Sequence, residues 1–293
     1  MIPQSQLAYL NSSVAVHLTN ITRATRIRCK WMNQTKSADI LVFDPKMLKC
    51  PIEHSNDIMW NSTYPGLTNI QSCPHGFKGV ASRNCSIEEN HGKWQKPNMS
   101  NCIRTSFLSI LQRVKRIYDG VAVDELGRVL NEFANETKAV TQANKTVVTD
   151  LRSSIDILAT ASVILSEREQ DITNEEIQEV FSATDSIMDI NTMDAWKEFH
   201  EQTGEKNAAT IFSIVSNISD LVLKTLPQNG SFRFVSENLA LQIQRTNIKQ
   251  ITYPDSNMLN VSSHAILPKS TILNSFNVSE TVDYTAAYYR TIS

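Results

Sequence analysis

The chain has 293 residues, of which 41% are hydrophobic and 20% are charged. This composition is typical of folded protein and argues against wholesale disorder, and the length corresponds to one large domain or two to three ordinary ones. Lys and Arg total 28 and Asp and Glu total 30, so the net charge is −2. This balance argues against a protein that binds nucleic acid by neutralising many phosphates, because such binding needs an excess of basic residues.

The start of the sequence carries no basic stretch followed by an apolar run, so it does not resemble a secretory signal. No segment reaches the roughly 18–20 apolar residues that a membrane-spanning helix needs. These two observations alone would predict a cytosolic protein. The sequons and the cysteines predict the opposite.

The pattern Asn-x-Ser/Thr, in which x is not Pro, occurs twelve times. Chance would give about four or five such sites in a chain of this composition, so the excess predicts exposure to the glycosylation machinery. The alternative is that Asn, Ser and Thr simply cluster in polar loops. The candidate glycosylation sites are Asn11, Asn20, Asn33, Asn61, Asn84, Asn98, Asn135, Asn144, Asn217, Asn229, Asn260 and Asn277.

All five cysteines lie in the first 102 residues: Cys29, Cys50, Cys73, Cys85 and Cys102. Such a block predicts a small disulfide-stabilised module beside a domain with its own core. An odd number leaves at least one cysteine without a partner in the chain. The last four cysteines allow three pairings, and their spacing does not choose among them.

The first two segments are polar and rich in turns. Residues 1–47 form an unassigned upstream tail, in which the apolar run 40–43 could form a strand. Residues 48–103 hold four cysteines, few helix formers and dense turn signals, which predict short strands held by disulfides.

Residues 104–226 change to helical periodicity, with about five helices and therefore a helical bundle. Thr173 and Glu176 fit a capping box, in which the Thr173 oxygen accepts from the Glu176 N–H while the carboxylate reaches back. A helix should end before Pro227. The apolar stripes are Phe107, Leu108, Leu111, Val114, Ile117 and Tyr118; Val147, Val148, Leu151, Ile155 and Leu158; and Ile211, Ile214, Val215, Ile218, Leu221 and Val222.

Residues 227–293 change to a period of two. Leu239, Leu241 and Ile243 alternate with polar or small residues, which predicts half-buried strands. Turns are predicted at 229–230 and at 254–255. The fold class is therefore multidomain α+β: a small disulfide-rich β module, then a helical bundle, then an incomplete β-sandwich.

The cysteine block resembles the hormone-receptor domain of adhesion G-protein-coupled receptors. The resemblance rests on Cys50-Pro51, Trp60, Gly66, Cys73-Pro74, Gly76, Gly79, Arg83, Cys85, Gly92, Trp94, Pro97 and Cys102. It implies the disulfides Cys50–Cys85 and Cys73–Cys102, and it leaves Cys29 unpaired. The chain lacks the third disulfide of the secretin-type relatives. A sushi module is the competing interpretation, because it also ends in Gly-x-Trp before its last cysteine.

The downstream sequence favours the adhesion receptors. The helical segment with Asp194-Ala195-Trp196 resembles subdomain A of the GAIN domain, and 236–241 resembles the start of subdomain B. The resemblance thus implies a hormone-receptor-like domain at 48–103, helical GAIN subdomain A at 104–226 and a partial subdomain B at 227–293.

Catalytic and metal-binding motifs are not evident. Cys73, His75, Cys85 and His91 lack the paired spacing of zinc ligands, so disulfides are the better interpretation. The sequence holds no nucleophile elbow, His-Glu-x-x-His pair or phosphate-binding glycine loop. We therefore expect no enzyme, no metal and no cofactor.

GAIN domains often cleave themselves at a His, a small hydrophobic residue and a Ser or Thr, flanked by Cys and Trp. In this chain no cysteine follows Cys102 and no histidine follows His264, and the residue two places after His264 is Ile266. We therefore predict no self-cleavage.

The leading hypothesis is an extracellular fragment of an adhesion G-protein-coupled receptor at the plasma membrane, cut short at both ends. Its partners would be an unidentified extracellular protein or peptide ligand and a seven-helix portion outside this chain. The alternative is a secreted glycoprotein that binds through a sushi-like module.

Overall fold

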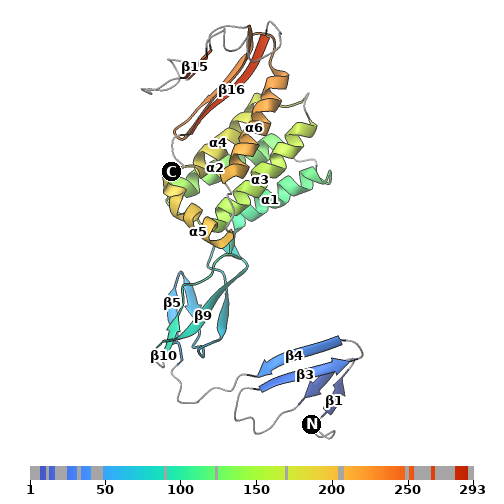
Figure 1. Cartoon of the computed structure of the whole chain (residues 1–293), viewed down its shortest axis with the longest axis vertical. Helices are drawn as coiled ribbons and strands as arrows, with labels where there is room; N and C mark the ends of the chain where they lie inside the picture. Colours follow the sequence, from blue (N-terminus) through green and yellow to red (C-terminus); the bar gives the residue numbers. More distant parts are fainter. Residues whose placement is uncertain are drawn as a thin grey trace. The chain divides into compact units, whose positions relative to one another are not determined.

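The computed structural model describes residues 49–88, 91–122, 125–168, 171–203, 208–247 and 281–289, and the backbone of six further strands. Contacts divide the chain into two compact units. The first unit comprises Met1–Gln71 and Ser82–Asn98, and the second comprises Ser72–Ala81 and Met99–Ser293. Each unit is described by itself, with the element labels of Figure 1.

The described part of the first unit is built from strands. Two hairpins pair β1 with β2 and β3 with β4, a third pairs β5 with β6, and β7, β9 and β10 form a sheet in the order β10-β9-β7. The bounds are β1 (Leu7–Leu10), β2 (Ser13–Val16), β3 (Thr25–Trp31), β4 (Gln34–Ile40), β5 (Glu53–Ser55), β6 (Ile58–Trp60), β7 (Thr68–Ser72), β9 (Val80–Glu88) and β10 (His91–Trp94). Strand β4 ends at Ile40, and the rest of the predicted 40–43 strand lies outside the described residues.

Six α-helices lie within the described residues of the second unit, where about five were predicted. They are α1 (Thr105–Tyr118), α2 (Leu126–Gln142), α3 (Val148–Glu167), α4 (Asn174–Ile187), α5 (Met193–Thr203) and α6 (Ala208–Thr225), with a 3₁₀ turn at Ile190–Thr192. Their apolar stripes form one core that includes Val114, Leu151, Phe181 and Ile218. Helix α6 ends before Pro227, as predicted.

The predicted capping box begins α4. The Glu176 N–H donates to Thr173 Oγ1 at 3.1 Å, and the Thr173 N–H donates to the Glu176 carboxylate at 3.0 Å. These bonds satisfy two backbone donors that the first turn of a helix leaves without a partner. The prediction is confirmed.

A three-stranded sheet completes the second unit. It comprises β12 (Ser231–Val235), β13 (Leu239–Asn247) and β16 (Thr281–Tyr289) in the order β12-β13-β16, and β13 contacts α4 and α6 (Figure 1). Two short strands, β14 (Ile251–Tyr253) and β15 (Ala265–Leu267), pair separately. Phe181 of α4 lies with its ring centroid 6.0 Å from Phe232 and 5.6 Å from Phe234, which anchors β12 to the helices.

The prediction of a half-buried strand is wrong for β13. Leu239, Leu241 and Ile243 are buried against the helices as expected, but Ala240 and Gln242 are 1% and 3% exposed on the opposite face. Period two identifies the alternating faces of a strand and not what covers the second face. Here the Gln242 amide donates to the Tyr284 hydroxyl of the neighbouring strand, at 2.9 Å.

Candidate functional site

The first disulfide closes the core of the first unit. Cys50 bonds to Cys85, with Cα atoms 6.0 Å apart, and the two residues are 0% and 2% exposed. This is one of the two pairs that the resemblance implies. Burial shields the bond from reductants in solution, so its role is structural.

An arginine forms the polar centre of this unit. The Arg83 guanidinium lies 5.7 Å from the ring centroid of Trp60 and 5.1 Å from that of Trp94. Its Nη1 donates to Glu53 Oε1 at 2.8 Å, and its Nε donates to the backbone carbonyl of Gln95 at 2.7 Å. At 8% exposure the charge is tolerated because a carboxylate, a carbonyl and two aromatic faces replace water.

The second disulfide belongs to the second unit. Cys73 bonds to Cys102, the other implied pair, with Cα atoms 5.6 Å apart. Gly79 passes beside it with φ of +118°, and a Cβ there would lie 2.0 Å from the carbonyl oxygen of Asn101. No side chain fits at this position, so glycine is required.

The residues next to the second disulfide connect directly to the helices. Strand β8 (Phe77–Lys78) pairs with β11 (Ile103–Arg104), and β11 continues without a linker into α1. The Thr149 hydroxyl, in the first turn of α3, donates to the Cys102 carbonyl at 2.7 Å. The hydroxyl therefore fixes the cysteine's own backbone to the bundle.

An ion pair completes this junction. Arg104 donates to both oxygens of Asp150 at 2.9–3.2 Å and to the Lys145 carbonyl at 2.9 Å, and its guanidinium lies 4.6 Å from the Phe77 ring centroid. The Asp150 side chain is 1% exposed. Burial raises the pKa of this carboxyl, and the Arg104 hydrogen bonds offset only part of that rise.

A second buried carboxylate joins the helices to the sheet. Asp185 of α4 accepts the backbone N–H groups of Asn238 and Leu239 at 2.7 and 2.9 Å, and the Ser236 hydroxyl at 2.9 Å. The Asn238 side chain donates back to the Asp185 carbonyl at 3.3 Å. We call these four residues the Asp185 clasp. They hold the turn between β12 and β13 against the end of α4.

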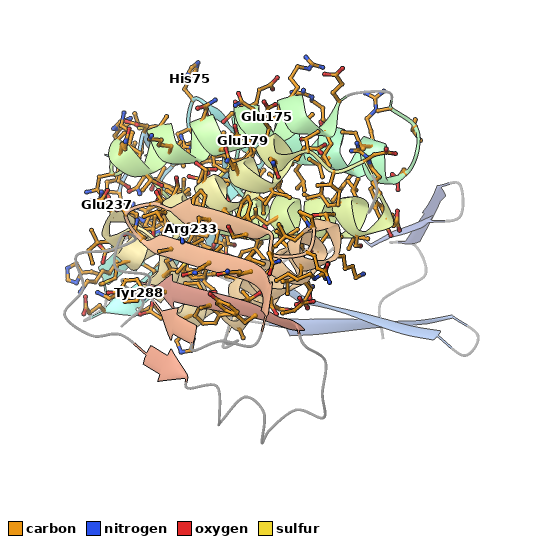
Figure 2. The ribbon with its side chains drawn as sticks, turned by 90° about the horizontal axis from the view of Figure 1, so that it is seen from above. His75, Glu175, Glu179, Arg233, Glu237 and Tyr288 are labelled. Carbon is orange, nitrogen blue, oxygen red and sulfur yellow. A yellow bond between two sulfur atoms is a disulfide. The ribbon has the colours of Figure 1, made fainter. Side chains whose placement is uncertain are left out.

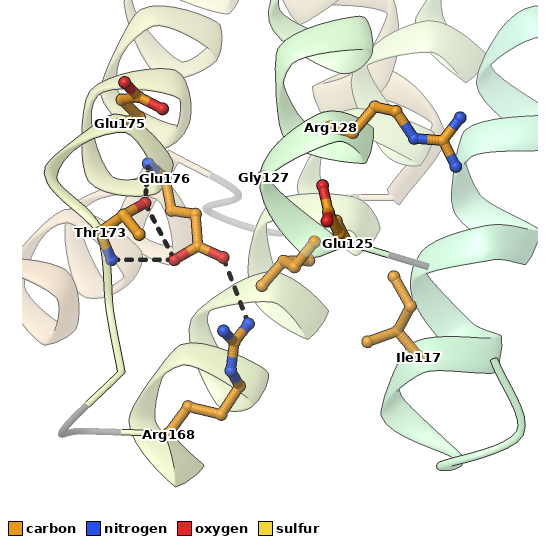
Figure 3. A pocket seen from close by; sticks show the side chains of 9 residues that line it. Ile117, Glu125, Gly127, Arg128, Arg168, Thr173, Glu175 and Glu176 are labelled. Atoms are coloured by element: carbon orange, nitrogen blue, oxygen red, sulfur yellow. Dashed lines mark hydrogen bonds and ion pairs between the residues drawn. The ribbon is translucent and has the colours of Figure 1, made fainter. Parts of the chain in front are cut away.

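One pocket of the second unit lies among the ends of four helices. It has a volume of about 600 Å³ and lies at the ends of α1 and α3 and the starts of α2 and α4 (Figure 3). Glu176 is engaged by Thr173 and by Arg168, whose Nη1 lies 3.2 Å from its carboxylate. The residues that line this pocket are Ile117, Glu125, Leu126, Gly127, Arg128, Arg168, Thr173, Glu175 and Glu176.

The alternative of a zinc site does not fit the cysteines. Cys73 and Cys85 are both bonded in disulfides, so neither can supply the thiolate that zinc binds. Among the described residues, no cluster of three or more His, Cys, Asp or Glu could hold a metal ion. Figure 2 shows His75 projecting alone from its loop.

The described sequon asparagines all lie at the surface. Asn61, Asn84, Asn98, Asn135, Asn144, Asn217 and Asn229 are exposed. Asn11, Asn20, Asn33, Asn260 and Asn277 lie outside the described residues, as does the side chain of Cys29 on β3. Asn84 Oδ1 accepts from the Thr68 hydroxyl at 2.6 Å, and the Asn135 amide donates to Asn131 at 3.0 Å.

Sequence reasoning missed Asp150, Asp185 and Asn238 as contact residues. Each bonds a partner 46 to 54 residues away in the sequence. No local pattern encodes such pairs. In the described part of the chain, no helix is both long and apolar enough to cross a membrane.

Comparison with known proteins identifies the cysteine block. The family model of the hormone receptor domain matches residues 47–105. The mouse adhesion G-protein coupled receptor F3 is 24% identical over 196 residues, covering 67% of this chain and 18% of the relative. The human adhesion G protein-coupled receptor L1 is 20% identical over 253 residues, covering 76% of this chain and 16% of the relative. The chain therefore spans less than a fifth of the length of these relatives.

A structure search gives a further match. The full extracellular region of zebrafish Gpr126/Adgrg6 is 18% identical, with a TM-score of 0.26, and the match covers 83% of this chain and 30% of that one. The family model and the two receptor sequences carry the assignment. Residues 47–105 match the hormone receptor domain, and over a longer stretch the chain is similar in sequence to the extracellular regions of adhesion G-protein-coupled receptors.

Proposed function

We propose that this chain is a ligand-binding and signal-coupling segment on the extracellular side of the plasma membrane. It binds an extracellular protein or peptide and passes the effect to a seven-helix membrane portion. In this proposal residues 104–226 are GAIN subdomain A and residues 227–293 are part of subdomain B. The twelve sequons are glycosylation sites, and Cys29 is unpaired among the cysteines of this chain.

One observation carries the coupling role. Strand β11, at the end of the hormone receptor match, runs into α1 without a linker, and Arg104 of β11 bonds Asp150 of α3 within the same compact unit. Linkers between domains usually permit relative motion. A strand that continues into a helix and is braced by a buried ion pair instead suits the transmission of force or rotation.

The first test is the transcript beyond Ser293. Seven apolar segments of about 20 residues each would support the receptor. A stop codon directly after this region in every transcript would overturn it and favour the alternative, a secreted glycoprotein. The match of residues 47–105 to the hormone receptor domain supports the receptor.

The second test addresses coupling in that full-length receptor. A tag at its N-terminus is pulled on living cells, and the G-protein response is compared at equal surface expression. Arg104→Met should reduce the response, while Arg113→Met, which removes an ion pair with Glu132 at a more exposed site, should leave it unchanged. Equal responses from both variants would contradict the coupling role.

A further inference from the structure

The β5–β6 hairpin of the hormone receptor domain has two unlike faces. Its inner face carries Ile58 and Trp60, which are 4% and 0% exposed. Its outer face carries Met59, which is 54% exposed, and Ile52, directly before β5, is 66% exposed. The strand register places exposed His54 opposite Met59 on the same outer side. Two large apolar side chains, Ile52 and Met59, are therefore turned toward water, and we call these two side chains the apolar face.

A sequon directly follows this hairpin on its outer side. Asn61 is exposed, as is Met59, while Trp60 between them is buried, so the alternation of the strand places Asn61 beside Met59. Residues two apart along a strand are separated by about 7 Å. A group attached to Asn61 therefore begins next to the apolar face.

The backbone at Asn61 is held in place. Its carbonyl accepts from the Thr63 hydroxyl at 2.8 Å and from the Asn69 side chain at 3.2 Å. Thr63 is also the hydroxyl residue of the sequon, and it is bridged to Cys50 beside the first disulfide. The backbone that carries the attachment point is thus anchored beside the first disulfide.

We propose that an N-linked glycan on Asn61 covers Ile52 and Met59, an inference that rests on the proposed extracellular role. The transfer forms a bond between Asn61 Nδ2 and C1 of N-acetylglucosamine. It breaks the bond from that C1 to a lipid pyrophosphate carrier, and the amide loses one proton. The methyl group and the C–H face of the first sugar lie over the two side chains, and the sugar hydroxyls face water.

This occupant fits the surface better than a protein partner does. The sequon places a bulky, solubilising group at the edge of the apolar face, where it obstructs a second chain. Apolar surface left bare in a secreted protein promotes association. The glycan therefore acts as a cover built into the sequence.

The experiment uses the whole chain, secreted from a eukaryotic host. Glycopeptide mass spectrometry should find Asn61 occupied. Asn61→Gln should raise the fluorescence of an apolar dye about two-fold or more and lower the monomer fraction in light scattering. Asn217→Gln, which removes an exposed sequon on α6, should change neither. Trimming the glycans to one sugar should preserve the wild-type behaviour.

Two further variants keep the test decisive. Ile52→Thr and Met59→Thr, added to Asn61→Gln, should restore low dye fluorescence and the monomer. Made in a host without glycosylation, the wild type and Asn61→Gln should be alike. An unoccupied Asn61 beside other occupied sequons would overturn this inference and leave the proposed function standing. No occupied sequon at all would overturn both. If Asn61 is glycosylated in the wild type and the two variants Asn61→Gln and Asn217→Gln show the same dye fluorescence and monomer fraction, the covering role alone is overturned.

Discussion

At the scale of single residues, two arginines organise the chain in the same way. Arg83 lies against two tryptophans and bonds Glu53, and Arg104 lies against Phe77 and bonds Asp150. The flat guanidinium can stack on a ring and donate in its own plane at once, which a lysine cannot do. Both sites therefore depend on arginine itself, not merely on positive charge.

Arg104→Met should destabilise the second unit strongly at neutral pH. It leaves the Asp150 carboxylate buried without its counter-ion, which costs about 3–5 kcal/mol when one partner of such a pair is removed. The pKa of Asp150 already lies above its ordinary value in the folded state, and the variant raises it further. The folded variant then takes up a proton more readily than the unfolded chain, so its stability falls as the pH rises from about 4 to 7.

Chemical denaturation at pH 4 and pH 7 measures this effect. The stability that Arg104→Met loses relative to the wild type should be larger at pH 7 than at pH 4. The double variant Arg104→Met with Asp150→Leu should recover part of this stability because no buried charge remains. Arg113→Met, whose partner Glu132 is more exposed, should cost less than about 1 kcal/mol. A loss that is equal at both pH values would show that Asp150 carries no unpaired charge in the variant.

Local pairs could be predicted from the sequence, and distant ones could not. Thr173 and Glu176 are three residues apart, so helix geometry alone brings them together. Arg104 and Asp150 are 46 residues apart, and their contact depends on how β11 meets α3. The pairs Cys50–Cys85 and Cys73–Cys102 were implied by the family resemblance, since spacing left three possibilities.

At the scale of elements, apolar periodicity identified α1, α3 and α6 and the sheet only in part. The stripe that includes Ile211 and Ile218 forms the buried face of α6, because the helices pack their apolar sides into one shared core. The polar side of β13 could not be assigned in this way. Gln242 is buried through contacts with β16, which follows about forty residues later.

Asp185→Ala should loosen the turn between β12 and β13. The substitution removes the carboxylate that accepts hydrogen bonds from the backbone N–H groups of Asn238 and Leu239 and from the Ser236 hydroxyl. The two N–H groups are buried, so water cannot replace the lost acceptor. Leaving a buried donor unsatisfied costs about 1–3 kcal/mol, so a loss of about 3 kcal/mol is expected. Hydrogen exchange at Asn238 and Leu239 should accelerate more than exchange in α1.

Two variants serve as controls for the Asp185 clasp. Asp185→Asn keeps one acceptor oxygen and should lose about half as much stability. Asp156→Ala removes an exposed carboxylate from α3 and should stay within about 0.5 kcal/mol of the wild type. If Asp185→Ala were as stable as Asp156→Ala, the clasp would not hold the sheet to the helices.

At the scale of the whole molecule, the compact units do not coincide with the sequence segments. The family match runs from 47 to 105, yet Ser72–Ala81 and the residues from Met99 onward belong with the helices. The sequence changes in composition after the last cysteine, whereas the boundary between the two compact units runs through the cysteine block. The second disulfide therefore works inside the helical unit, and the first works outside it.

The chain from Met1 to Ser293 should remain in one piece after secretion and purification. Self-cleavage in GAIN domains needs a hydroxyl nucleophile two residues after a histidine, and Ile266 occupies that place after His264. An isoleucine side chain can neither donate a proton to the imidazole nor attack a carbonyl. The purified protein should run as a single band near 33.0 kDa on a denaturing, reducing gel once its glycans are removed. Two bands of constant ratio, formed with protease inhibitors present from the start, would contradict the prediction. If the wild type runs as one band, Ile266→Ser tests whether the missing hydroxyl is what prevents cleavage.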